Sequence, residues 1–179
     1  MSLADYYAYS RKILIGLVFS CIGDAFLVWK SSGYFVHGLL MFALAQVMYT
    51  TAFGFRPLSP RIGMILLAMG MVVYSYLLPG LHGVMVYLTL LYVLLIVLMG
   101  WRAIARVQFF DDLWTWTKLC SCFGSICFIV SDTVIAIDKF LSPMTYSHQV
   151  IMVSYYAAQF GISLSVVDSQ VDALLTKTK

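Results

Sequence analysis

Long apolar segments alternate with short polar connections along the whole chain. Each apolar segment is close to the length that an α-helix needs to cross the hydrocarbon core of a membrane, which is roughly 20 residues. The connections contain Gly, Pro and Ser, which favour turns. The apolar segments are Ile13–Trp29, Tyr34–Phe55, Ile62–Leu78, Gly83–Trp101, Leu119–Ile137 and His148–Val167. The pattern therefore predicts an all-α polytopic membrane bundle of about six transmembrane helices.

The short connections predict that consecutive helices are antiparallel neighbours within a single domain. We expect one transmembrane domain over residues 13–167, a cytoplasmic N-terminal segment over 1–12 and a cytoplasmic tail over 168–179. The connection between residues 102 and 117 is longer and mixes charged with aromatic side chains. Such a mixture is typical of a segment on the membrane surface, and a solvated loop with interfacial aromatics fits equally well.

The composition excludes several classes of protein. Of the 179 residues, 62% are hydrophobic and 11% are charged, whereas soluble domains are roughly 25% charged. A water-soluble enzyme of this size could not bury so much apolar surface. The net charge of +3 comes from scattered Lys and Arg, so we expect no nucleic-acid partner. An aromatic content of 16% excludes a disordered chain.

Lys and Arg are distributed unevenly between the two ends of the expected bundle. Nine lie at the end that holds both termini, and two, Lys30 and Lys139, lie at the other end. Positive residues are enriched on the cytoplasmic side of membrane proteins. We therefore expect both termini to be cytoplasmic.

Two carboxylates, Asp24 and Asp132, lie inside apolar segments. A charged side chain in hydrocarbon costs at least about 2.5–3.5 kcal/mol, so intramembrane carboxylates usually have a functional role. Both precede the non-cytoplasmic end of their segment by a similar number of residues, and their helices run in the same direction, so they should lie at one depth. They can face each other if the two helices are neighbours. The alternative is two isolated carboxylates, each paired with a hydroxyl or a backbone carbonyl group.

Other polar side chains gather at the same depth. His37, His82 and His148 lie at the non-cytoplasmic ends of their segments, and Tyr155 and Gln159 share one helical face with His148. The histidines lack the HxxxH or HxH spacing that zinc sites favour, so we assign no metal and no cofactor.

A faint internal repeat relates the two ends of the chain. The order Asp, His, Gln occurs twice, first at Asp24, His37 and Gln46 and again at Asp132, His148 and Gln159. A parallel repeat of this kind would place the two carboxylates on opposite sides of a shared cavity.

Several stretches of the sequence carry a resemblance to a known family. They are RKILIGLVFSCIGDAFLVW, GYFVHGLLMFALAQVMYTTAFG, MGWRA, FIVSDTVIAIDKF and YYAAQ. From about Arg11 to Val167 the chain resembles the YhhN/lysoplasmalogenase-like family, of the transmembrane protein 86 type. The resemblance implies a multi-pass hydrolase of the endoplasmic reticulum membrane that cleaves the sn-1 vinyl ether bond of lysoplasmalogens. Its products are a fatty aldehyde and a glycerophospho-ethanolamine or -choline, and the paired catalytic aspartates of the family match Asp24 and Asp132.

Two features depart from the family pattern. The resemblance implies about eight spans, so we expect this chain to lack an N-terminal hairpin of the family. Members often carry His at the position where this chain has Gln46.

Hydrolysis of a vinyl ether begins with protonation of its outer alkene carbon, which gives an oxocarbenium ion. Glycosidases use two carboxyl groups for a reaction with a similar transition state. We expect Asp132 to be the general acid and Asp24 the base. The candidate substrate-binding residues are His37, Tyr155, Gln159, Lys30 and Lys139, with the two lysines at the lipid phosphate. Interfacial anchoring of the lysines is the alternative for that pair.

Two other functions fit the same residues. Intramembrane carboxylate pairs also serve proton relays, so a proton-linked transporter is one alternative, although no apolar segment is broken by an internal Pro. The other alternative is a family member without catalytic activity that binds lipid or a protein partner. The expected partners of an enzyme are a lysophospholipid substrate and the membrane lipids around it.

Overall fold

The computed structural model describes residues 3–29, 33–107 and 115–167. Within these residues the chain forms a bundle of α-helices with one short 3₁₀ helix and no strand, as the apolar pattern predicts. The elements are α1 (Leu3–Val28), α2 (Phe35–Phe53), α3 (Pro60–Leu77), the 3₁₀ helix η2 (Leu78–Gly80), α4 (Val84–Val107), α5 (Trp116–Phe140) and α6 (Ser147–Leu164). Each α-helix overlaps one of the apolar segments, so the expected fold class is confirmed.

Two helices extend beyond their apolar segments. Helix α1 begins at Leu3 rather than Ile13, and α4 ends at Val107 rather than Trp101. A helix continues into polar sequence when the residues favour it, and basic residues such as Arg106 are favourable in a last turn. An apolar segment therefore marks the length of chain in hydrocarbon, not the full helix. The aromatic part of the expected surface segment, residues 108–114, lies outside the described residues.

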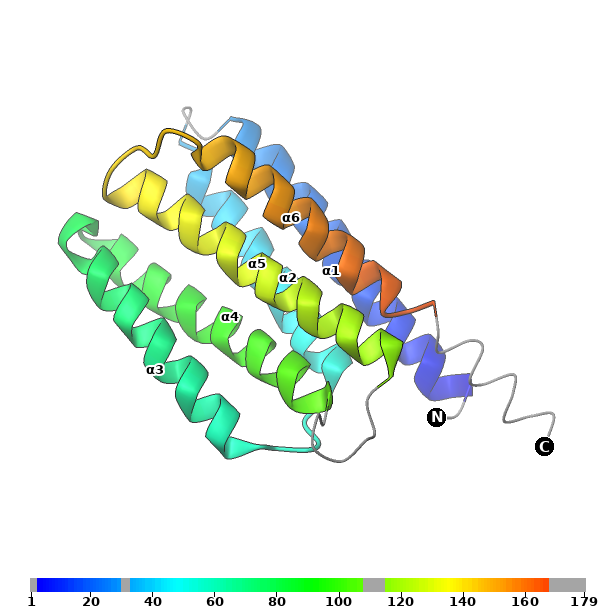
Figure 1. The fold of residues 1–179 in the computed structure, drawn as a ribbon. Helices are drawn as coiled ribbons and strands as arrows, with labels where there is room; N and C mark the ends of the chain where they lie inside the picture. Colours follow the sequence, from blue (N-terminus) through cyan, green and yellow to red (C-terminus); the bar gives the residue numbers. More distant parts are fainter. Residues whose placement is uncertain (1–2, 30–32, 108–114, 168–179) are drawn as a thin grey trace.

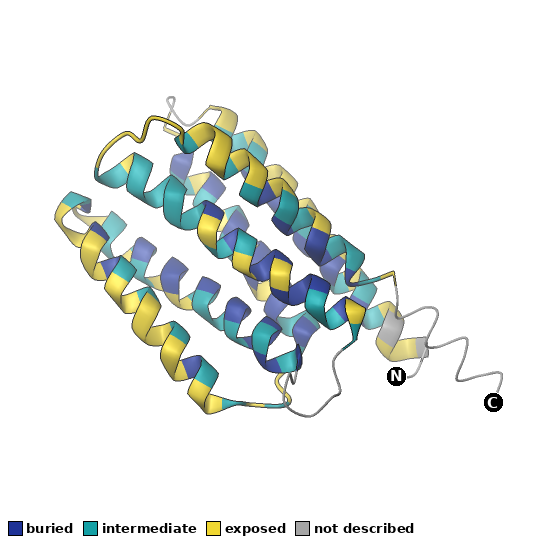
Figure 2. Ribbon diagram, in the orientation of Figure 1, coloured by how far each residue is buried: buried dark blue, intermediate teal, exposed yellow. Residues whose placement is uncertain are grey.

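Five helices form a closed ring, and α3 packs on its outside (Figure 1). The order around the ring is α1, α2, α4, α5, α6 and back to α1, and the most extensive contacts join α1 to α2 and α5 to α6. Helix α3 packs mainly on α4, and most of its surface is exposed (Figure 2). Polar side chains that point into the ring are thus enclosed by five helices.

Four helices within the described residues are long and apolar enough to cross a membrane: α2, α3 with η2, α4 and α5. Helix α1 carries three charged residues in its apolar part, Arg11, Lys12 and Asp24, and α6 carries polar residues that include His148 and Gln159. Both still lie lengthwise against a spanning helix (Figure 1). The chain is therefore a multi-pass membrane protein, and the crossing of α1 and α6 remains a prediction.

Glycines allow α5 and α6 to approach with their backbones in contact. A Cβ atom on Gly124 would lie 2.8 Å from the carbonyl oxygen of Ala158, and one on Gly161 would lie 2.9 Å from that of Cys120. Small residues permit such close packing of membrane helices. The glycines of α1 have a different role, because Gly16 lies against the ring of Tyr49, which reaches from α2 toward the centre of the bundle.

Aromatic side chains fill the centre of the ring. The ring of Phe128 lies 6.1 Å from that of Phe42, 6.3 Å from that of Tyr49 and 5.9 Å from that of Tyr155, in T-shaped arrangements. Edge-to-face packing of this kind is favourable for aromatic pairs. It brings side chains of α2, α5 and α6 into contact beneath the polar groups described below.

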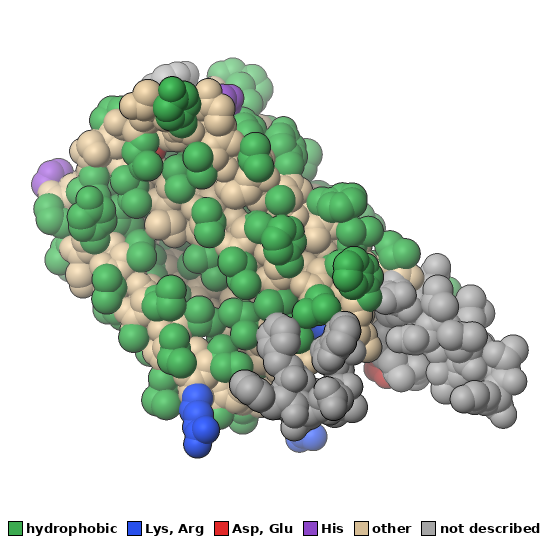
Figure 3. Space-filling model, in the orientation of Figure 1, with side chains coloured by type: hydrophobic (Ala, Val, Ile, Leu, Met, Phe, Trp, Pro, Cys, Tyr) green, Lys and Arg blue, Asp and Glu red, His purple; other side chains and the backbone are tan. Residues whose placement is uncertain are grey.

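Most of the basic side chains lie at one end of the bundle, and the histidines lie at the other. On the face that Figure 3 shows, Lys and Arg lie at the lower end and His at the upper end. Arg102, near the C-terminal end of α4, is fully buried, and it connects α4 to the segment between α2 and α3. Its Nε and Nη2 atoms donate to the carbonyl oxygens of Gly54 and Pro57, at 2.6 and 2.8 Å.

Candidate active site

Asp132 is held by side chains from two other helices. Its Oδ2 atom accepts hydrogen bonds from the hydroxyl group of Tyr92 in α4 and from Nε2 of Gln46 in α2, the latter at 3.4 Å. Tyr92 is 9% exposed and Gln46 is fully buried. The carboxyl group is thereby fixed in orientation inside the ring.

Asp24 is held in a corresponding way. Its Oδ2 atom accepts a hydrogen bond of 2.7 Å from the hydroxyl group of Tyr155, a buried residue of α6. Each aspartate is bonded to a residue of the other closely packed helix pair. Asp24 of α1 accepts from Tyr155 of α6, and Asp132 of α5 accepts from Gln46 of α2. Only one half of the faint repeat has an Asp–Gln contact, because Gln46 contacts Asp132 whereas Gln159 contacts Tyr49.

Asp132 and Asp24 line two cavities that share several lining residues, so they lie in neighbouring parts of the bundle. Among the described side chains, no hydrogen bond joins one carboxylate to the other. Each aspartate pairs with a tyrosine hydroxyl group of its own, as the alternative of separate carboxylates expects, and their action as one pair stays a prediction. A pair of separately oriented carboxyl groups is suited to separate acid and base roles.

A second layer of polar side chains lies next to this pair. The hydroxyl group of Tyr49 donates to Oε1 of Gln159 at 3.1 Å and lies 3.2 Å from Oγ of Ser20. Several buried polar atoms near it have no hydrogen-bond partner: Oε1 of Gln46, Nε2 of Gln159 and Oγ of Ser125. Polar side chains thus continue through the interior along α1, α2, α5 and α6.

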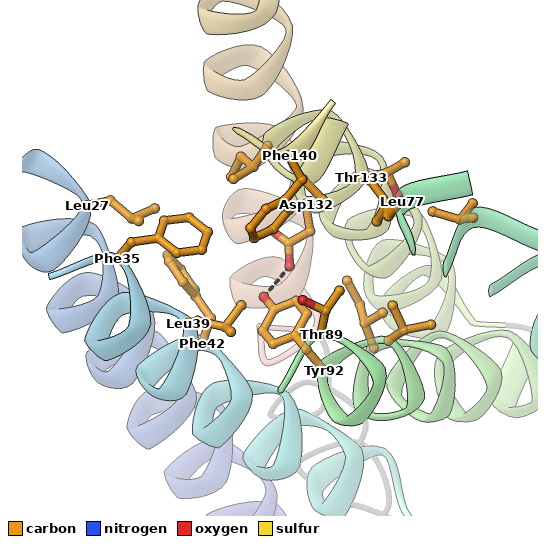
Figure 4. A pocket seen from close by; sticks show the side chains of 15 residues that line it. Leu27, Phe35, Leu39, Phe42, Leu77, Thr89, Tyr92, Asp132, Thr133 and Phe140 are labelled. Carbon is orange, nitrogen blue, oxygen red and sulfur yellow. Dashed lines mark hydrogen bonds between the residues drawn. The ribbon is translucent and has the colours of Figure 1, made fainter. Parts of the chain in front are cut away.

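Two cavities of different character flank the carboxylates. The wide cavity has a volume of about 550 Å³ and is lined by Asp24, Tyr155, Lys139 and His148 among others. The narrow cavity has a volume of about 60 Å³ and is lined by Asp132 and mainly apolar residues (Figure 4). The cavities adjoin, and the residues that line both are Leu27, Phe35, Phe42 and Ile135.

The structure brings some of the predicted substrate-binding residues together and not others. Tyr155 contacts Asp24, Gln159 lies in the second polar layer, and Lys139 lines the wide cavity with its Nζ 5.3 Å from the centre of the Phe35 ring. His37 lies away from both cavities, exposed between the rings of Phe26 and Tyr34 at 5.5 and 5.6 Å. Lys30 lies outside the described residues.

The histidines do not form a cluster. His148 lines the wide cavity, and His82 is exposed in the connection before α4. In the described part of the chain, no three His, Cys or Asp side chains come together in a way that could hold a metal ion.

The sequence pattern does not single out Tyr92 or Thr89, and it marks Gln46 as a member of the faint repeat and a departure from the family pattern, not as a substrate-binding residue. Helix α4 is apolar at nearly every position, so its tyrosine and threonine look like packing residues. One signal was available, because Thr89, Tyr92 and Val93 recur at the three- and four-residue spacing of one helical face. Their pairing with Asp132 on another helix cannot be read from that spacing.

These features define a class of protein: a multi-pass helical membrane protein with a candidate acid–base site between its helices. The chain belongs to the YhhN family, whose model matches residues 2–166. It is 48% identical to lysoplasmalogenase TMEM86A of Bos taurus and 47% identical to that of Homo sapiens, in each case over 90% of this chain and 67% of the relative. It is 35% identical to lysoplasmalogenase TMEM86B of Homo sapiens over 91% of this chain and 66% of the relative. No solved structure matches the chain.

Proposed function

We propose that this chain is a lysoplasmalogenase, a membrane hydrolase that cleaves the sn-1 vinyl ether bond of lysoplasmalogens. The products are a fatty aldehyde and a glycerophospho-ethanolamine or -choline. The observation that carries the proposal is the pair of intramembrane carboxylates, each oriented by a tyrosine beside a cavity. The pair occurs in a chain that is 47–48% identical to relatives named as lysoplasmalogenases.

Asp132 acts as the general acid in the first half of the reaction. It transfers a proton to the outer alkene carbon, the electrons of the double bond form the new C–H bond, and an oxocarbenium ion remains. Water then adds to the inner carbon and gives a proton to Asp24, which leaves a hemiacetal. Because Tyr92 and Gln46 both donate to Oδ2 of Asp132, Oδ1 is left to carry the transferred proton.

Collapse of the hemiacetal returns both carboxyl groups to their starting states. Asp24 gives its proton to the glycerol oxygen as the bond between carbon and that oxygen breaks. Asp132 takes the proton of the hemiacetal hydroxyl as the aldehyde C=O bond forms. One water is consumed in the cycle, and no other co-reactant is required.

The wide cavity accommodates the polar part of the substrate. Lys139 and His148 lie at its rim, and a lysine is suited to a lipid phosphate as a point charge. The cavity is also the route by which water reaches Asp24. The excess of Lys and Arg at the opposite end of the bundle supports cytoplasmic termini in the endoplasmic reticulum membrane (Figure 3).

The test is release of fatty aldehyde from a lysoplasmalogen by the purified chain in detergent, beside Asp24→Asn and Asp132→Asn. Each substitution removes a titrating group with almost no change of shape, so we expect the rate to fall by at least about a hundredfold. Asp5→Asn, the same change at an exposed position near the start of α1, should retain the rate of the parent. Parent-like turnover in either of the first two variants, or no aldehyde from a folded parent, would overturn the proposal.

A further inference from the structure

The narrow cavity has the character of a binding site for hydrocarbon. Eleven of its fifteen lining residues are apolar, and they come from five of the helices. Its volume of about 60 Å³ leaves room for about four water-sized groups. The cavity therefore fits the first atoms of a single unbranched chain and excludes a phosphate head group.

One hydroxyl group in this cavity has no partner. The hydroxyl of Tyr92 is bonded to Asp132, and Oγ1 of Thr133 donates to the carbonyl oxygen of Ile129 at 2.7 Å. Thr89, by contrast, is 5% exposed and its Oγ1 atom has no hydrogen bond. A buried hydroxyl without a partner is uncommon in native proteins and indicates a missing one.

The position of Thr89 relates it to the reacting atoms. Thr89 precedes Tyr92 by almost one helical turn, and Figure 4 shows both side chains extending from α4 toward Asp132 of α5. An alkene carbon that takes a proton from Asp132 is separated from the ether oxygen by one other carbon. A hydroxyl group beside the acid is therefore in the right region to reach that oxygen.

We propose that the narrow cavity binds the vinyl ether end of the alkenyl chain, and that the Thr89 hydroxyl donates a hydrogen bond to the ether oxygen. This inference rests on the proposed function and deepens it by naming the chain subsite and a residue that determines specificity. The glycerol and phosphate then extend past Leu27, Phe35 and Phe42, which line both cavities, into the wide cavity.

Thr89 has a kinetic signature that a residue needed only for folding lacks. The ether oxygen of the substrate accepts a hydrogen bond, whereas the same oxygen accepts hardly any once it carries positive charge in the oxocarbenium ion. The bond is therefore stronger in the bound substrate than in the transition state. Its loss should raise KM without lowering kcat.

The first experiment measures steady-state aldehyde release by Thr89→Val, which keeps the shape of the side chain and removes the hydroxyl. We expect KM to rise about five- to tenfold, in line with the loss of one neutral hydrogen bond, while kcat is unchanged or higher. Thr89→Ser keeps the hydroxyl and should restore KM. Thr51→Val is the matched control, because the hydroxyl of Thr51 is already bonded to the carbonyl oxygen of Met48 at the end of α2.

The second experiment separates binding from turnover with two unreactive ligands. One is a saturated 1-O-alkyl lysophosphatidylcholine, and the other is the same molecule with a methylene group in place of the ether oxygen. Thr89→Val should weaken binding of the first by the factor seen in KM and leave binding of the second unchanged. Ala136→Leu, which adds bulk to the wall of the narrow cavity, should weaken binding of both.

The outcomes distinguish this inference from the proposed function. An active parent with unchanged KM and unchanged ligand affinity in Thr89→Val would overturn the role of Thr89. Unchanged affinity in Ala136→Leu would overturn the assignment of the cavity. Absence of aldehyde release by a folded parent would overturn the proposed function itself. Thr89→Ala also lacks the hydroxyl and replaces Thr89→Val if the valine variant does not fold.

Discussion

Asp24 and Asp132 are chemically identical side chains in different surroundings. The carboxyl group of Asp132 accepts two hydrogen bonds on one oxygen and borders a narrow apolar cavity. That of Asp24 accepts one bond from Tyr155 and borders a wide cavity that also holds a lysine and a histidine. Enzymes that assign acid and base roles to two carboxyl groups do so through such differences in environment. The apolar side suits a proton donor, and the wide side suits the group that activates water.

Tyr92→Phe removes the hydroxyl group that donates to Asp132. A hydrogen bond to a charged group contributes about 1.5–3 kcal/mol, and the hydroxyl of Tyr92 orients the proposed acid. We expect kcat to fall about tenfold or more, with KM nearly unchanged, because the lost contact is to Asp132 and not to the substrate. Tyr76→Phe, at an exposed position of α3, is the control. A parent-like kcat in Tyr92→Phe would show that Asp132 needs no orientation from α4.

At the scale of the elements, the helices could be predicted from the sequence, but their arrangement in a ring could not. Apolar runs of membrane length give the number of helices directly. The residues that share one face of a helix are also predictable from their spacing, as Tyr155 and Gln159 show. Contacts between helices depend on packing that leaves no linear pattern. The contacts of Gln46 and Tyr92 with Asp132 therefore cannot be predicted from the sequence. His37, a predicted substrate-binding residue, packs on Phe26 instead.

The contact between α5 and α6 positions one tyrosine and one glutamine of the site, and it depends on glycine. Gly161→Val would place methyl groups against the backbone of α5 near Cys120 and Gly124. Overpacking typically costs about 1–3 kcal/mol, so we expect a lower melting temperature in detergent and slower aldehyde release. Ala68→Val, at an exposed position of α3, adds the same branched side chain without a neighbouring helix. Equal melting temperatures for the two variants would contradict the close packing of α5 on α6.

The two ends of the bundle differ chemically. Most of the basic residues lie at the end where α1 begins and α6 ends (Figures 1 and 3). Lys139 in the last turn of α5 and His148 in the first turn of α6 lie at the other end, and both line the wide cavity. The polar part of the substrate would then enter from the non-cytoplasmic side. The single chain of the lipid would be buried between helices at the depth of Asp132.

The orientation can be tested with one cysteine placed at each end of the bundle. Leu58 in the α2–α3 connection and Met144 in the α5–α6 connection are exposed, at 59% and 45%. Three helices, α3, α4 and α5, separate the two positions, and all three are long and apolar enough to span. The two positions must therefore lie on opposite sides of the membrane, whichever side is cytoplasmic. The parent chain, with its four native cysteines, gives the background.

In sealed microsomes with the cytoplasmic face outward, a membrane-impermeant maleimide should label Leu58→Cys at once. Met144→Cys should be labelled only after the membrane is permeabilised. The reason is electrostatic, because the connections on the side of Leu58 carry most of the Lys and Arg, and such loops are retained in the cytoplasm. The reverse pattern would place the wide cavity and its lysine on the cytoplasmic side, so that the head group would enter from the cytoplasm. Labelling of both positions in sealed vesicles would mean that α3, α4 and α5 do not all cross.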